Sequence, residues 1–161
     1  MQNDKYIWFI LIILLYNVNI HNIYATTINK YHCKHKIIKH KHHHEEQGIA
    51  SFYGINDGFQ HKKMANGEKF NTFNLTAAHH SLPFGSKVKV INKHNRKFTY
   101  VIIKDRIPKH NKRIIDLSFK AAKYLNIQKQ GLACVTIIKV SNKEFYRYLR
   151  NINYKTTIKS Y

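Results

Sequence analysis

The sequence predicts one mainly β domain, folded as a closed or nearly closed barrel with one or two short helices. Short segments rich in β-branched and aromatic residues alternate with turn residues, which is typical of strands. All six glycines and both prolines fall between residues 48 and 131, where tight turns need them. One helix-forming run among several strands favours a barrel. A chain of 161 residues has room for one such domain with flanking segments.

Four segments are predicted to be strands because each is short, apolar and bounded by turn residues: Ile49 to Tyr53, Lys87 to Ile91, Phe98 to Ile103 and Leu132 to Val140. The run Phe119 to Leu125 has apolar residues at helical spacing and follows Asp116-Leu117-Ser118, which supplies a capping residue. It is therefore predicted to be a helix. The domain is expected to span residues 48–140.

Residues 1–25 are predicted to be a signal peptide. Lys5 provides a positive start, Ile7 to Leu15 is an unbroken apolar run, and cleavage is expected after Ala25. An uncleaved anchor is the alternative, although the run is short for a bilayer span. The chain is therefore expected to be exported, to the periplasm or cell envelope of a bacterium.

Two polar segments flank the predicted domain. Residues 26–47 are rich in His and Lys and have too few apolar residues to form a core, so we expect a linker. Residues 141–161 form a basic tail, expected to be a marginal helix or disordered.

The two cysteines, Cys33 and Cys134, lie far apart in segments of different character. They predict no disulfide framework. Cys33 also lacks the small apolar residues that precede a lipid-attachment site, so no lipid anchor is expected.

The formal net charge of +20 makes polyanions the natural partners. Anionic envelope polymers and lipid headgroups suit an exported chain. Nucleic acid is a further alternative, but it requires a cytosolic protein. A general drift of composition toward Lys, Ile and Asn explains the same charge without any partner.

Carboxyl groups are scarce, since residues 48–140 contain only four. Asp57 lies in an Asn-Asp-Gly turn and is expected to cap backbone amides. Glu68 follows a turn and is either a solvated loop charge or part of a site. Asp105 ends an apolar strand, where desolvation favours proton donation, with pairing to Arg106 as the alternative. Asp116 precedes the predicted helix and is either a cap or a catalytic group.

Histidines and aromatic residues give weaker signals. The tract of His32, His35, His40, His42, His43 and His44 is irregularly spaced, so no metal site and no cofactor are predicted. His79 precedes a turn and is either a satisfied buried histidine or part of a site. Phe52 and Tyr53 are either core residues or a surface on which sugars stack.

Six motifs occur in a fixed order: Gly48 to Gly54, Ala65 to Phe70, Leu75 to His79, Leu82 to Val88, Asp105-Arg106, and Arg113 to Ser118. Together they resemble the rare lipoprotein A family of septal-ring lytic transglycosylases. The resemblance implies a six-stranded double-psi β-barrel of the barwin and expansin type. It further implies cleavage of the β-1,4 bond between N-acetylmuramic acid and N-acetylglucosamine in peptide-poor peptidoglycan strands, leaving 1,6-anhydro ends.

The resemblance also suggests site residues. Asp105 matches the family's proposed catalytic aspartate, and Glu68 and His79 match polar residues grouped with it. Asp116 matches the acid position of the wider expansin-like superfamily. Whether Asp105 or Asp116 donates the proton stays open, with Asp105 favoured. Phe52, Tyr53 and Arg106 are the expected substrate-binding residues.

The chain departs from the family pattern at several positions. Ile107 stands where the family usually has glycine after Asp-Arg, and Phe52 stands where it has tryptophan. Met64 replaces a threonine, and the glycan-binding module that many relatives carry after the barrel is not expected here. These departures keep a second hypothesis open, that of a non-catalytic wall-binding protein in the manner of expansins.

Overall fold

The computed structural model describes the chain from Cys33 to Ile158, apart from residues 34–35, 41–42 and 109–111. The expected signal peptide, residues 1–25, lies outside the described residues. So do His32, His35 and His42 of the histidine tract.

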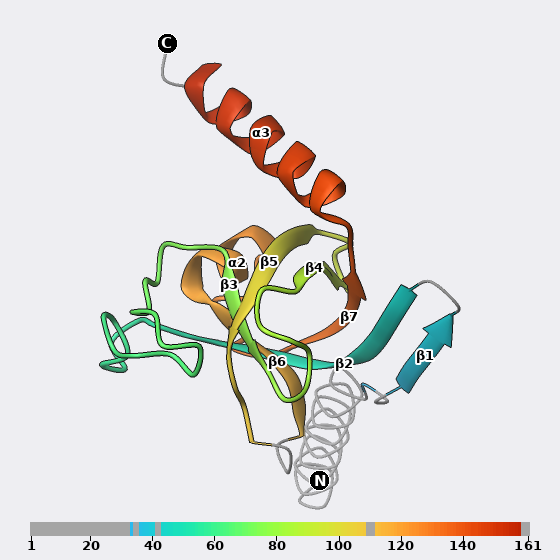
Figure 1. Cartoon of the computed structure of the whole chain (residues 1–161), viewed down its shortest axis with the longest axis horizontal. Helices are drawn as coiled ribbons and strands as arrows, with labels where there is room; N and C mark the ends of the chain where they lie inside the picture. Colours follow the sequence, from blue (N-terminus) through green and yellow to red (C-terminus); the bar gives the residue numbers. More distant parts are fainter. Residues whose placement is uncertain (1–32, 34–35, 41–42, 109–111, 159–161) are drawn as a thin grey trace, which may run out of the picture. The chain divides into compact units, whose positions relative to one another are not determined.

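Seven strands form one continuous sheet in the order β1-β2-β6-β3-β5-β4-β7 (Figure 1). Pairing of β2 with β7 closes six of them into a barrel and leaves β1 outside it. This confirms the predicted six-stranded β-barrel. The strands are β1 (Lys36–His40), β2 (His43–Tyr53), β3 (Thr76–His79), β4 (Lys87–Asn92), β5 (Phe98–Asp105), β6 (Arg113–Ser118) and β7 (Ala133–Lys139).

Two of the strand pairs are parallel, β2 with β6 and β3 with β5, and the other pairs are antiparallel. Each parallel pair contains a register shift, between Ile49 and Ala50 in β2 and between Ala77 and Ala78 in β3. Such irregularities bend a strand and re-aim its side chains. The mixed topology agrees with the expected double-psi arrangement.

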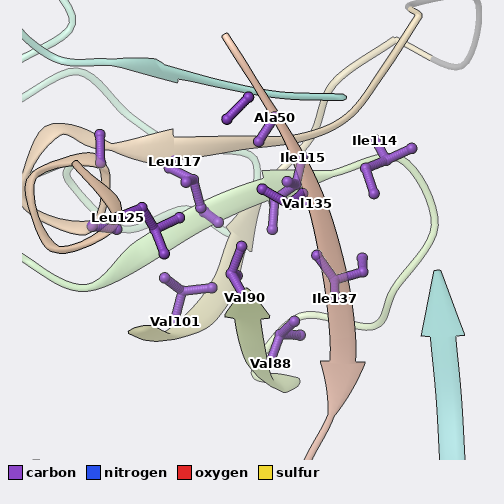
Figure 2. Close-up of a cluster of buried hydrophobic side chains, with 14 of the residues drawn as sticks. Ala50, Val88, Val90, Val101, Ile114, Ile115, Leu117, Leu125, Val135 and Ile137 are labelled. Atoms are coloured by element: carbon purple, nitrogen blue, oxygen red, sulfur yellow. The ribbon is translucent and has the colours of Figure 1, made fainter. Parts of the chain in front are cut away.

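The barrel interior is filled by alternate residues of each strand. In β4, Val88 and Val90 are fully buried and their neighbours are only partly covered. Val135 and Ile137 of β7 follow the same alternation, as a strand buried on one face requires. Figure 2 shows these side chains converging with those of Ile115, Leu117 and Leu125 on one core.

Two helices complete the described fold. Helix α2 (Phe119–Leu125) follows β6 directly and packs against β2, β5 and β6. Its N-cap is Ser118, whose hydroxyl accepts from the amide of Ala121. Asp116 lies within β6, so its expected capping role is wrong. β6 was not predicted, because its short sequence contains Asp116 and Ser118, which are residue types typical of turns.

The basic tail contains helix α3 (Asn142–Ile158). Phe145 is buried at its start, and the Tyr148 ring packs on Tyr100 with centroids 4.3 Å apart. The Tyr100 hydroxyl donates to Glu144 over 2.6 Å. These contacts fix the first turns of α3, so the alternative of a disordered tail is wrong for this part. None of the helices within the described residues has the length and apolar character needed to cross a bilayer.

The expected linker over residues 26–47 is wrong for its second half. Strand β1 pairs with the start of β2, and residues 45–50 of β2 also pair with β7. Backbone hydrogen bonds hold these strands, and such bonds do not require apolar side chains. A criterion based on apolar content therefore could not detect them. Glu46, assigned to the linker, is buried inside the fold.

The expectation that the two cysteines form no disulfide is also wrong, because Cys33 and Cys134 are bonded to each other. Cys134 lies in β7 opposite Ile49 of β2, and Cys33 precedes β1, which pairs with the same β2 strand. The sheet therefore brings together two cysteines that are 101 positions apart in the chain. Disulfides form in oxidising compartments, and a bond closing so long a loop restricts the unfolded chain.

Replacing both cysteines, Cys33→Ser with Cys134→Ser, should lower the free energy of unfolding by about 2–5 kcal/mol, because the unfolded state loses its cross-link. Urea unfolding followed by circular dichroism measures this. Wild-type protein treated with a reducing agent should match the double variant. Equal stability of the oxidised and reduced forms would contradict the assigned bond.

Candidate active site

The register of three neighbouring strands places two carboxyl groups on either side of one small residue. Ala78 of β3 pairs with Asp105 of β5 on one side and with Asp116 of β6 on the other. Two strand spacings of about 4.8 Å put the Cα atoms of the two aspartates about 10 Å apart. The residue between them, Ala78, has a small side chain and lines a pocket together with both aspartates.

A pocket of about 270 Å³ occupies this position. Both aspartates line it, together with aromatic, cationic and small residues from β2, the loop after β2 and the segment after β5. Its lining residues include Ser51, Phe52, Tyr53, Phe59, Ala78, Asp105, Arg106, Ile107, Arg113 and Asp116. Five of the seven residues predicted for the site therefore share one pocket, and Glu68 and His79 do not line it.

The Asp105 carboxylate is held by three donors. Its Oδ1 accepts from the backbone amides of Ala65 and Arg106, both over 2.9 Å. Its Oδ2 accepts from the Tyr53 hydroxyl over 3.4 Å. Two amide donors fix Oδ1 as an acceptor, so Oδ2 is the oxygen that a ligand or proton would meet.

The ring of Tyr53 is held in position by contacts with two phenylalanine rings. It stacks on the buried Phe70 with centroids 4.5 Å apart, and it meets the Phe59 ring in a T-shaped arrangement with centroids 5.8 Å apart. Burial, followed by the negative charge of Asp105, raises the pKa of Tyr53 well above its usual range. The hydroxyl therefore keeps its proton at physiological pH and donates to Asp105.

Asp116 has a different environment. Its side chain is 13% exposed, and Oδ1 lies 2.9 Å from Nε of Arg113. The two atoms are at ion-pair distance, so the guanidinium of Arg113 attracts the Asp116 carboxylate. Burial raises the pKa of Asp116, and Arg113 opposes the shift in part. A carboxyl whose pKa is raised by burial is suited to proton donation.

Arg106 does not neutralise Asp105, contrary to one expectation from the sequence. Its guanidinium stacks on the Phe84 ring, 3.8 Å from the centroid, and donates to the backbone oxygens of His79 and Asp105. Ile107 is buried beside it. Among the described residues, the non-glycine positions with positive φ are Asn56, His61, Arg96 and Asn126. The turn therefore accepts Ile107 without the conformation that glycine would supply.

The loop between β2 and β3 contains Ala65, whose backbone amide binds Asp105. This loop begins at Gly54, where a residue with a side chain would be strained. Gly54 has φ +104°, and a Cβ there would lie 2.5 Å from Oγ1 of Thr72. Asp57 accepts from the amides of Gly54 and Phe59, which confirms its expected role in the turn. The loop geometry thus supports the amide that binds Asp105.

His79 is fully buried, and its ring is directed away from the pocket toward β2. Nδ1 accepts from the backbone amides of Ser81 and Leu82 over 3.1 and 3.0 Å. Because Nδ1 accepts, the proton of the neutral ring lies on Nε2, which donates to the buried Glu46 over 3.1 Å. Sequence reasoning missed Glu46, since no local pattern marks it as buried.

The ligand atoms of Glu46, His79 and His80 lie within 4.8 Å of one another, close enough in principle for a metal ion. A metal-bound histidine normally donates its second ring N–H to an acceptor. In His79 that second nitrogen instead accepts two amides, which leaves the proton on Nε2 and blocks coordination there. The arrangement fits a hydrogen-bonded pair better than a metal centre.

Glu68 lies on the surface, where it forms a salt bridge with Lys104 and accepts from the Asn66 side chain. Its side chain is 55% exposed. The hydrogen bond from Lys104 lowers the pKa of Glu68, so it stays ionised and is poorly suited to proton donation. The structure thus separates Glu68 and the His79 ring from the two aspartates.

Replacing the buried acceptor, Glu46→Ala, should destabilise the fold by at least about 2 kcal/mol, because the Nε2 proton of His79 loses its partner and a cavity forms. The neighbouring variant Glu45→Ala, at a partly exposed position, should stay within about 0.5 kcal/mol of wild type. Urea unfolding compares them. Equal effects of the two changes would contradict the proposed role of the Glu46–His79 pair in stability.

The chain is similar to proteins of known family over most of the barrel. A family model described as lytic transglycolase matches residues 45–137. A Rickettsia felis protein named endolytic peptidoglycan transglycosylase RlpA is 48% identical over 111 residues, which cover 68% of this chain and 48% of the relative. The Rickettsia typhi protein of the same name is 47% identical over 113 residues, covering 70% and 35%.

A third relative with this name, from Helicobacter pylori, is 48% identical over 91 residues, covering 56% of this chain and 28% of the relative. The chain thus spans half or less of the length of these curated relatives. The region matched by the family model covers all or most of each of the six barrel strands and both aspartates of the pocket. The chain therefore belongs to the lytic transglycolase family, among relatives named RlpA.

Proposed function

We propose that this protein is an endolytic peptidoglycan transglycosylase. It cleaves the β-1,4 bond between N-acetylmuramic acid and N-acetylglucosamine in peptide-poor strands and leaves 1,6-anhydro-muramic ends. One observation carries the proposal: a single pocket holds two carboxyls in contrasting environments. Asp105 is bound by three donors, and Asp116 is mostly buried and has a raised pKa. The names of the relatives support the same reaction.

Asp116 is the proton donor in this proposal. Burial raises the pKa of its carboxyl, which favours the protonated form before reaction. Its proton passes to the oxygen that bridges the two sugars, and the bond from that oxygen to the muramic C1 breaks. The nearby Arg113 then stabilises the carboxylate that remains. The sequence favoured Asp105 as donor, and the contrast between the two environments favours Asp116.

Asp105 is the base. Its Oδ2 takes the proton of the muramic C6 hydroxyl while that oxygen bonds to C1, so a proton leaves one aspartate and another arrives at the second. Exchange with solvent restores both groups. Tyr53, which stays protonated, donates to the same Oδ2 and orients it. No water attacks the sugar in this reaction. In ordinary glycosidases, by contrast, water attacks the sugar directly or hydrolyses a covalent glycosyl-enzyme intermediate.

The pocket also offers surfaces for binding sugars. Phe52 and Tyr53 present partly buried rings, and the exposed Arg106 is fixed by Phe84. Aromatic faces suit the apolar sides of sugar rings, and a guanidinium suits carboxylates. The net charge of +20 adds attraction to anionic envelope polymers. No cofactor enters the proposed reaction.

We place the protein in the cell envelope. The leader expected at residues 1–25 and the disulfide between Cys33 and Cys134 support export, since disulfides persist in oxidising compartments.

The activity is tested by incubating the protein with peptide-free glycan strands and analysing the products by mass spectrometry. Asp105→Asn and Asp116→Asn should each reduce the release of anhydro-muramic products by about 100-fold or more, as expected for loss of a general acid or base. Glu68→Gln should stay close to wild type. Wall binding without anhydro products would refute the enzyme and favour the non-catalytic alternative.

The pH profile tests the assignment of the acid. If Asp116 donates the proton, kcat/KM falls as the pH rises through the pKa of Asp116. Arg113 lowers that pKa, so Arg113→Gln should raise it and move the alkaline limb to higher pH. Lys112→Gln removes an adjacent exposed charge and should move the limb much less. If the alkaline limb of the kcat/KM profile stays at the same pH in Arg113→Gln, Asp116 is not the donor.

A further inference from the structure

A second pocket, of about 510 Å³, lies over helix α2 and the loop that precedes β3. We call it the α2 pocket. It is lined by Phe73, Phe119, Lys120, Lys123 and Tyr124. Three aromatic rings and two lysines make it apolar with a cationic edge. No acidic side chain is among the described residues that line it.

Phe73 is the most unusual residue of this pocket, because it is 63% exposed although hydrogen bonds hold the backbone on both sides of it. On one side of it, the oxygen of Thr72 accepts from the amide of Lys120 over 3.1 Å. On the other side, the oxygen of Asn74 accepts from the Ser118 hydroxyl over 2.6 Å. An exposed aromatic ring on an anchored backbone is pre-organised for a ligand rather than for the core.

The α2 pocket adjoins the pocket of the two aspartates. Phe119, which lines the α2 pocket, packs on Phe52, with ring centroids 6.0 Å apart. Phe52 in turn lines the aspartate pocket. The two cavities are therefore neighbours, with one lining ring of each in contact with the other.

Charge selects the ligand class. Lys120 and Lys123 provide two cations beside three rings whose faces suit the apolar sides of sugars. A glycan strand with carboxylate substituents satisfies both features, since its sugar faces stack and its carboxylates pair with ammonium groups. Continuity with the aspartate pocket favours the same strand rather than a separate ligand.

We propose that the α2 pocket is a distal subsite for an acidic glycan strand whose scissile bond lies between Asp105 and Asp116. This rests on the proposed function for the identity of the strand. Phe73 and Tyr124 stack on sugar rings, Lys120 and Lys123 pair with carboxylates, and the Phe52–Phe119 contact connects the two sites. The subsite makes binding depend on strand length.

The test measures binding, not cleavage, in the full chain carrying Asp105→Asn. Peptide-free peptidoglycan oligomers of increasing length, from a disaccharide upward, are titrated by calorimetry. Affinity should rise once the oligomer is long enough to reach both pockets. Phe73→Ala should then weaken binding of the long oligomers by about tenfold and leave the shortest unchanged, as expected for one lost aromatic contact.

Matched variants separate this effect from nonspecific ones. Tyr146→Ala removes another exposed ring, 55% exposed on α3, and Lys143→Ala removes an exposed charge there. Neither should change the length dependence, whereas Lys123→Ala should weaken the long oligomers only. All these positions are exposed, so the variants should fold.

The outcomes distinguish the subsite from the proposed enzyme. If wild-type protein releases no anhydro products but Phe73→Ala still weakens long oligomers selectively, the subsite stands and the catalytic proposal fails. If wild type cleaves strands but affinity is independent of length, or if Phe73→Ala and Tyr146→Ala behave alike, the subsite is wrong and the enzyme stands.

Discussion

Pairing of β3 with both β5 and β6 is the constraint on which the rest of the site depends. It sets Ala78 between Asp105 and Asp116 and fixes the separation of the two carboxyls by strand spacing. The closed barrel holds this register, because a slip of one residue would turn buried side chains outward. The register shift between β3 and β5 lies at the same point, because β5 has one extra residue, Lys104, opposite Ala77 and Ala78. Such irregularities commonly re-aim functional side chains.

Around this pair, the fold gives each aspartate its own environment. Backbone amides and Tyr53 surround Asp105 with donors, whereas Asp116 is mainly desolvated. Opposite environments for two nearby carboxyls are a common way to separate an acid from a base. The Glu46–His79 pair holds His79 in place, and the backbone oxygen of His79 accepts a hydrogen bond from the pocket residue Arg106.

Much of the fold could be predicted from the sequence because its strands are short, apolar and separated by turn residues. β4, β5 and β7 followed this rule. β3 was missed because Thr-Ala-Ala-His lacks branched apolar residues. β1 was missed because it is an edge strand held by backbone pairing, which leaves no apolar pattern in the sequence. The bond between Cys33 and Cys134 follows from pairing across the sheet, which spacing along the chain cannot reveal.

The candidate site was predictable in its members but not in its geometry. Asp105, Asp116 and Tyr53 meet in one pocket, yet only the register shows that they do. Glu68 and His79 matched family motifs, but a surface lysine binds the first and a buried glutamate binds the second. Their contacts depend on long-range topology, and the burial of Glu46 had no local signal.

A crystal structure of Asp105→Asn with a bound peptide-free glycan oligomer would show whether the scissile bond lies between residues 105 and 116. The proposed mechanism requires that the bridging oxygen lie within hydrogen-bond reach of the Asp116 carboxyl, at about 2.6–3.2 Å, with the muramic C6 hydroxyl facing residue 105. An oligomer bound elsewhere, or one whose scissile bond lies out of reach of Asp116, would contradict it.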